Sequence, residues 1–192
     1  MSETERVAHA ATPLSKLLHT VDPARLSDPT PCAEFDIRAL LNHLLFWGPS
    51  LVGAARKDAV APPAAAEADI DLTAGDWAAA LDAHLDALAT AWTDPAAWRG
   101  VTHMGGPTEL PAPLVGGMVV GELIVHGWDL ARAVGATPHW DDDFLRTTYD
   151  ETAATAEQGR QMGIYGPEVP VDATAPPLDR ILGLTGRDPS WP

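Results

Sequence analysis

The sequence predicts an all-α fold in which four or five helices pack as a bundle around one core. The first observation is that apolar residues recur at helical spacing in several segments of helical length. The second is that glycine and proline are concentrated between these segments, where they end helices and form loops. The third is length: 192 residues fit one domain of ordinary size, so we expect residues 1–192 to form a single domain.

The first two predicted helices lie in the N-terminal part of the chain. Apolar side chains recur at helical spacing in residues 4–21, with Pro13 near the middle as an irregularity. After a proline-rich loop, Asp36 is a good N-cap for a second helix whose apolar positions again follow a period of about 3.6. The pair Gly48-Pro49 is expected to bend or end this helix.

The rest of the chain predicts three more helices and little sheet. A proline- and alanine-rich connection, residues 61–73, is expected to run over the surface to a third helix near residues 75–92. Glycine and proline then punctuate a stretch that allows at most one or two short strands. A fourth helix is expected from near Pro113 to Gly135, a residue type suited to the left-handed conformation after a helix end. A fifth helix and a short closing helix are expected at residues 142–162 and 178–186.

The charge balance of the chain excludes some classes of partner. It carries 27 acidic against 12 basic side chains, a formal net charge of -15. That charge would repel a phosphate backbone, so we expect no nucleic-acid binding. The N-terminal residues contain no apolar stretch of secretory length, and no segment reaches about 18 uncharged apolar residues, so we expect no membrane partner. Cys32 is the single cysteine, which fits the reducing cytoplasm.

An acid and an imidazole stand out in the predicted fourth helix. Glu122 and His126 lie one helical turn apart among apolar neighbours, so both can converge on one point. A carboxylate buried there must be paired, protonated or metal-bound, because burying it alone costs several kcal/mol. His43 shares a face with apolar residues on the second helix. Helices that each point polar ligands inward are how bundle cores build metal sites.

His43, Glu122 and His126 would give a cation three protein ligands and leave a fourth position open. This is the ligand set of a catalytic rather than a structural zinc site. Asp129, three residues beyond His126, can accept the other ring N–H. The alternatives are a helix-stabilising polar pair between Glu122 and His126, and a neutral histidine hydrogen-bonded in the core. Spacing alone does not decide between these interpretations.

Three stretches of the sequence resemble a known family: TPCAEFDIRALLNHLLFW, GELIVHGWDLARAVG and YGPEVPVDATAPPLDRILGLTGRDPSW. They lie in this order and are spread over most of the chain, from residue 30 to residue 191. Together they are similar to the actinobacterial metal-binding proteins of the DinB-like superfamily, in particular the N-terminal domain of mycothiol-dependent maleylpyruvate isomerases. The resemblance implies an up-down-down-up four-helix bundle, with short extra helices or strands and a divalent metal at one end of its core. It places the family's metal ligands on His43, Glu122 and His126.

The resemblance also implies a class of chemistry. Members with known activity are similar to thiol transferases that use mycothiol or bacillithiol as the nucleophile. This implies an enzyme with zinc, or else nickel or iron, that acts as a mycothiol S-transferase or isomerase on a small electrophilic substrate. Isomerases of the family carry a second domain that supplies part of the active site. These residues show no counterpart of it, so the resemblance does not extend to maleylpyruvate isomerisation itself.

Two other functions stay open at this point. The same metal can hold a water near neutral pKa, which would make the chain a hydrolase. A closed or structural site would instead make it a non-catalytic protein that binds a metal or another ligand.

Other side chains are candidates for the mouth of the site. Trp47, His103 and Met104 are expected to line it, with packing in the core as the simpler role for Trp47. Cys32 comes shortly before the second helix. We expect it to be a small packed residue, with approach to the site as the alternative.

The C-terminal region offers candidates for two further roles. Arg180 or Arg187 can bind a carboxylate, although a surface guanidinium is the simpler expectation. The candidates for a homodimer contact are Trp140, Trp191 and the proline-rich tail, residues 165–192.

Overall fold

The computed structural model describes residues 1–192 and confirms the all-α prediction. Its six helices are Arg6–Leu18 (α1), Ile37–Ala55 (α2), Trp77–Ala91 (α3), Ala112–Ala133 (α4), Asp142–Gln161 (α5) and Pro177–Leu184 (α6). Short 3-10 turns cover Glu3–Glu5, Pro23–Arg25, Glu67–Asp69 and Pro95–Trp98. Two strands, Val101–His103 (β1) and Glu109–Pro111 (β2), pair antiparallel as one hairpin, in line with the small amount of sheet expected.

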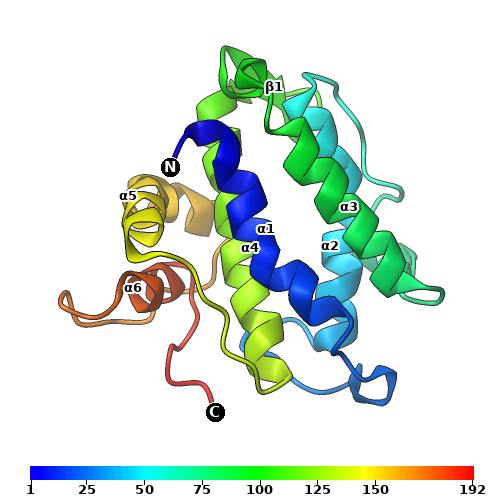
Figure 1. Cartoon of the computed structure of the whole chain (residues 1–192), viewed down its shortest axis with the longest axis vertical. Coiled ribbons are helices and arrows are strands. Elements are labelled where there is room, and N and C mark those ends of the chain that lie inside the picture. The colour runs from blue at the N-terminus through cyan, green and yellow to red at the C-terminus, as the bar shows by residue number, and fades with distance from the viewer.

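Helices α1 to α4 form a four-helix bundle. α1 packs against α3 and α4, and α2 also packs against both of them, so each helix has two neighbours around a shared core. Figure 1 shows α1 and α4 running one way and α2 and α3 running the other, which is the up-down-down-up order. Because α2 and α3 run in the same direction, residues 56–76 return the chain along the length of the bundle. α5 and α6 pack against each other, and α5 packs against α4.

The start of α2 follows the prediction and its end does not. The side chain of Asp36 caps the helix by accepting a hydrogen bond from the backbone N–H of Ala39 at 2.8 Å. The helix does not end at Gly48-Pro49 but continues to Ala55. Proline removes one backbone donor, whereas the residues on either side of it are buried in the core, and that packing holds the helix together.

α4 is the longest helix and lies at the centre of the molecule. By length and composition alone it could cross a membrane, but 72% of its most apolar 18-residue window is buried inside the protein. The hydropathy of α4 therefore reflects the core that it builds with α1 and α2. The helix is followed by Gly135 at φ 78°, the left-handed conformation expected there.

Trp140 is a core residue, which corrects its suggested role in a dimer contact. Its side chain is only 2% exposed, and its indole N–H donates a hydrogen bond to the carbonyl of Ala10 at 3.2 Å. The link between α4 and α5 turns this ring inward against α1, so it offers no surface to a second chain. Trp191 is partly buried and packs against the same core.

Candidate metal site

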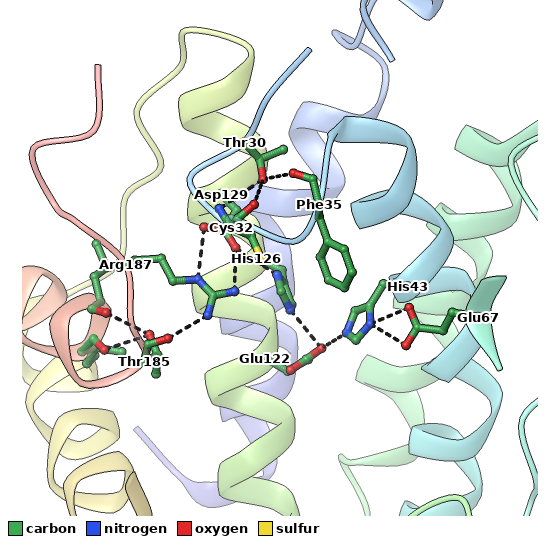
Figure 2. Close-up of polar contacts among 12 residues, drawn as sticks. Thr30, Cys32, Phe35, His43, Glu67, Glu122, His126, Asp129, Thr185 and Arg187 are labelled. Atoms are coloured by element: carbon green, nitrogen blue, oxygen red, sulfur yellow. Dashed lines mark hydrogen bonds and ion pairs between the residues drawn. The ribbon is translucent and has the colours of Figure 1, made fainter. Parts of the chain in front are cut away.

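α2 and α4 bring the three predicted ligands together. His43 projects from α2, and Glu122 and His126 project from successive turns of α4. The potential ligand atoms of these side chains all lie within 4.8 Å of one another. Figure 2 shows the Glu122 carboxylate lying between the two imidazole rings.

One oxygen of Glu122 faces both histidines. Its Oε1 lies 2.6 Å from Nε2 of His43 and 3.4 Å from Nε2 of His126. The two ring centroids are 4.9 Å apart. The two imidazoles therefore present the same nitrogen to the same carboxylate, as a shared cation would require.

Each histidine is held on its far side by a second carboxylate. Nδ1 of His126 donates to Oδ2 of Asp129 at 3.0 Å, which confirms the predicted hydrogen bond. Nδ1 of His43 donates to both oxygens of Glu67 at 3.0 and 3.1 Å. Carboxylates in this position fix the tautomer and orientation of metal-binding histidines. In both rings Nε2 is therefore the atom directed at Glu122.

Asp129 is part of a buried ion pair with Arg187, which follows α6. Nη2 of Arg187 donates to Oδ2 of Asp129 at 3.1 Å, and Nη1 donates to the carbonyl of Thr185 at 2.8 Å. Asp129 is completely buried and the Arg187 side chain is 9% exposed. The expectation of a surface guanidinium at Arg187 is wrong, because the turn after α6 brings this side chain back onto α4. Arg180 instead stacks over the ring of Tyr149 at 3.8 Å.

The charges of this cluster stabilise one another. Burial alone would lower the pKa of His43, but its hydrogen bonds to Glu122 and Glu67 raise it to about 10. Burial also disfavours a charged His126, whereas the negative charge of Glu122 raises its pKa. Burial would raise the pKa of Glu122, but His126 and His43 hold it well below its usual value. In the absence of a cation, His43 is thus an imidazolium that donates from both ring nitrogens.

Apolar groups surround the cluster on two sides. The Phe35 ring lies 5.1 Å from the His43 ring and 6.1 Å from the His126 ring, measured between centroids. Beyond Glu122 is a narrow cavity of about 20 Å³, lined mostly by leucines of α2, α3 and α4 together with Trp47 and His84. That volume accommodates about one water molecule.

The donor set fits a divalent cation. Two imidazole nitrogens and a carboxylate oxygen are ligands that zinc accepts, and nickel and iron accept the same types. His43, Glu122 and His126 would hold the ion, while Glu67 and Asp129 orient the rings. Binding would displace the proton at Nε2 of His43, so the affinity for metal should fall at low pH.

The other residues expected near the site have varied positions. Trp47 lies beside it, because its indole N–H donates to Oε1 of Glu67 at 2.8 Å. His103 belongs to β1 and Met104 packs against the core, and neither forms a hydrogen bond with the three predicted ligands. Cys32 is half-buried near Asp129 and Arg187, where burial raises the pKa of its thiol.

Glu67 is the site residue that sequence reasoning missed. It lies in residues 61–73, whose composition indicated a surface connection, and nothing in the local pattern distinguishes it from the neighbouring acids. It reaches His43 only because the chain returns along the bundle between two parallel helices. The one feature of the sequence that indicates a polar partner is the spacing of His43 and Trp47, two side chains with ring N–H groups one turn apart on α2.

Comparison with known proteins places the chain in a family. The family model described as the mycothiol maleylpyruvate isomerase N-terminal domain matches residues 7–131, which include His43, Glu122, His126 and Asp129. Two uncharacterised proteins of Mycobacterium tuberculosis, from different strains, are each 29% identical to this chain over 173 residues, which is 89% of this chain and 90% of theirs.

A solved structure shares the fold. It is a crystal structure of the mycothiol-dependent maleylpyruvate isomerase, with a TM-score of 0.61 and 18% sequence identity. The match covers 92% of this chain and 78% of that one, so the likeness extends beyond residue 131 into the region of α5 and α6. By the extent of the family match, this chain belongs to the mycothiol maleylpyruvate isomerase N-terminal domain family.

Proposed function

We propose that this chain is a divalent-metal-dependent enzyme that activates a small thiol of the mycothiol type toward an electrophilic small molecule, as an S-transferase or isomerase. The observation that carries the proposal is the convergence of His43, Glu122 and His126 on one point at the junction of α2 and α4. The name of the family and that of the solved isomerase support a thiol as the cosubstrate.

The chemistry follows from a cation with an open position. A divalent cation at this site would supply Lewis acidity, which lowers the pKa of a thiol and holds its thiolate near an electrophile. The protein's own side chains orient the two imidazole rings and pack around them. Asp129 and Glu67 fix the two rings through their Nδ1 atoms, and the Phe35 ring lies beside both of them.

The metal part of the proposal is tested by elemental analysis. Wild type, His43→Ala and His139→Ala are purified in parallel, the last as a control because His139 is exposed and is not part of the group of potential ligands. We expect about one zinc, nickel or iron ion per chain in wild type and in the control, and a large loss in His43→Ala. Equal metal content in all three would rule out this site.

The thiol part is tested by calorimetric titration of the metal-loaded protein with mycothiol. We expect saturable binding that His43→Ala abolishes. Absence of binding would remove the thiol chemistry from the proposal. Hydrolytic turnover that needs no thiol and rises with pH through the pKa of a bound water would favour a hydrolase instead.

The cellular setting follows from the same proposal. A thiol cosubstrate and an unpaired Cys32 both fit a reducing cytoplasm. We expect small molecules as partners rather than nucleic acid, given the net charge of -15.

A further inference from the structure

Glu67 connects the return segment of the chain to the proposed metal site. Its two carboxylate oxygens accept hydrogen bonds from Nδ1 of His43, and Oε1 also accepts from the indole N–H of Trp47 at 2.8 Å. His43 and Trp47 lie one turn apart on α2, so both donors point to the same side of the helix. The carboxylate is thus held by two donors on a rigid element.

The backbone around Glu67 is also attached to α2, through the residue next to His43. The side-chain amide of Asn42 donates to the carbonyl of Glu67 at 3.2 Å and accepts from the backbone N–H of Leu72 at 2.8 Å. Asn42 is adjacent in sequence to His43. The 3-10 turn Glu67–Asp69 is therefore fixed to α2 by its backbone and by its side chain at once.

The two outer carboxylates, Glu67 and Asp129, differ in how their negative charges are compensated. Asp129 is neutralised by Arg187, whereas Glu67 forms its one ion pair with His43. A cation held by His43, Glu122 and His126 would carry one uncompensated positive charge after Glu122 is counted. The negative charge of Glu67, transmitted through the imidazole, would offset it.

We propose that Glu67 is a positioning residue for the metal site, and that metal binding and attachment of residues 66–73 to α2 stabilise each other. This inference rests on the proposed function. In this arrangement a loop outside the four bundle helices orients His43 so that its Nε2 faces the metal. Because coupling is reciprocal, a metal at the site should also hold the loop in place.

The direct test compares zinc affinity, by competition with a chelator, in wild type, Glu67→Gln and Asp69→Asn. Asp69→Asn is the matched control, because it removes one negative charge from the same turn. The Asp69 carboxylate accepts only from the backbone N–H of Ala66. We expect about 10–100-fold weaker zinc binding in Glu67→Gln and little change in Asp69→Asn. The visible spectrum of the cobalt-loaded protein should change in Glu67→Gln alone.

Each other outcome has a defined meaning. Equal losses in the two variants would reduce the effect to net charge and overturn positioning. Wild-type affinity in Glu67→Gln would overturn it too, while leaving the proposed function intact. A wild-type chain that binds no zinc would reject the proposed function, and this inference with it.

A second measurement needs no variant and so does not depend on how Glu67→Gln folds. Hydrogen exchange of the Ile70 and Leu72 amides is followed in wild type with and without zinc. The Ile70 amide donates to the carbonyl of Glu67, and the Leu72 amide donates to the side chain of Asn42. We expect exchange at these amides to slow on addition of zinc, with no comparable change in the β1–β2 hairpin. Unchanged exchange in a zinc-loaded protein would contradict the coupling.

Discussion

At the scale of single residues, the site consists of charges that are stable only together. α4 brings His126 and Asp129 into the interior and Glu122 to a partly buried position beside them, where an unpaired charge would be costly. Each has a partner: Glu122 faces the histidines, and Asp129 binds both His126 and Arg187. Removal of one of these side chains should therefore lower the free energy of unfolding by more than the loss of its own contacts would.

The Arg187–Asp129 pair gives a stability prediction. Arg187→Gln leaves the Asp129 carboxylate fully buried without its cation, so we expect the free energy of unfolding to fall by about 3–5 kcal/mol. Urea unfolding followed by circular dichroism measures it. The double variant Asp129→Asn with Arg187→Gln should recover part of the loss because no buried charge is left unpaired. A loss below about 1 kcal/mol in the single variant would mean that the pair behaves like a surface ion pair.

His43 gives a pH prediction for the metal-free protein. Its pKa rises from an ordinary 6.5 to about 10 in the folded state. A raised pKa means that the folded state binds the proton more tightly, so this stabilisation is complete below pH 6.5 and is lost as pH rises toward 10. We expect the difference in unfolding free energy between wild type and His43→Ala, with chelator present, to shrink over that range. A difference that grows with pH would contradict the ion-paired arrangement.

At the scale of elements, apolar periodicity located the helices because each one buries a single stripe. It also placed His43 on α2 and Glu122 and His126 on α4, but spacing left their role open, and the family resemblance was needed to predict them as metal ligands. The contacts of Asn42 and Trp47 with Glu67 could not be predicted in this way, since they depend on how residues 56–76 return along the bundle. Pro49 shows the same limit: local preference predicted a helix end, and packing in the core decided otherwise.

The packing of α4 gives a prediction with an internal control. At Gly116, an added Cβ would overlap the ring of Trp98 and lie 2.9 Å from the ring of Trp92. We expect Gly116→Ala to destabilise the protein by about 1–3 kcal/mol, since both indoles are buried and fixed by hydrogen bonds to backbone carbonyls. Gly121→Ala on the same helix has no neighbour within 4 Å and should be neutral or slightly stabilising. Thermal unfolding compares the two, and equal effects would contradict this packing.

At the scale of the whole molecule, the bundle and the tail form one structure around the proposed site. α5 and α6 pack beside α4, and the turn after α6 brings Arg187 to Asp129. This closure could not be predicted from sequence, because an arginine near a chain end is ordinarily exposed. The family match stops at residue 131, yet the structural likeness to the isomerase extends past it. The tail therefore belongs to the arrangement that supports His126.

The most direct test of the proposed metal site is an anomalous difference map from crystals of the zinc-loaded protein, recorded on both sides of the zinc absorption edge. We expect one strong peak in contact with Nε2 of His43, Nε2 of His126 and the carboxylate of Glu122, with Glu67 and Asp129 still bound to the far sides of the rings. A map with no peak there, or a peak bound by other residues while the imidazolium of His43 still donates to Glu122, would contradict it.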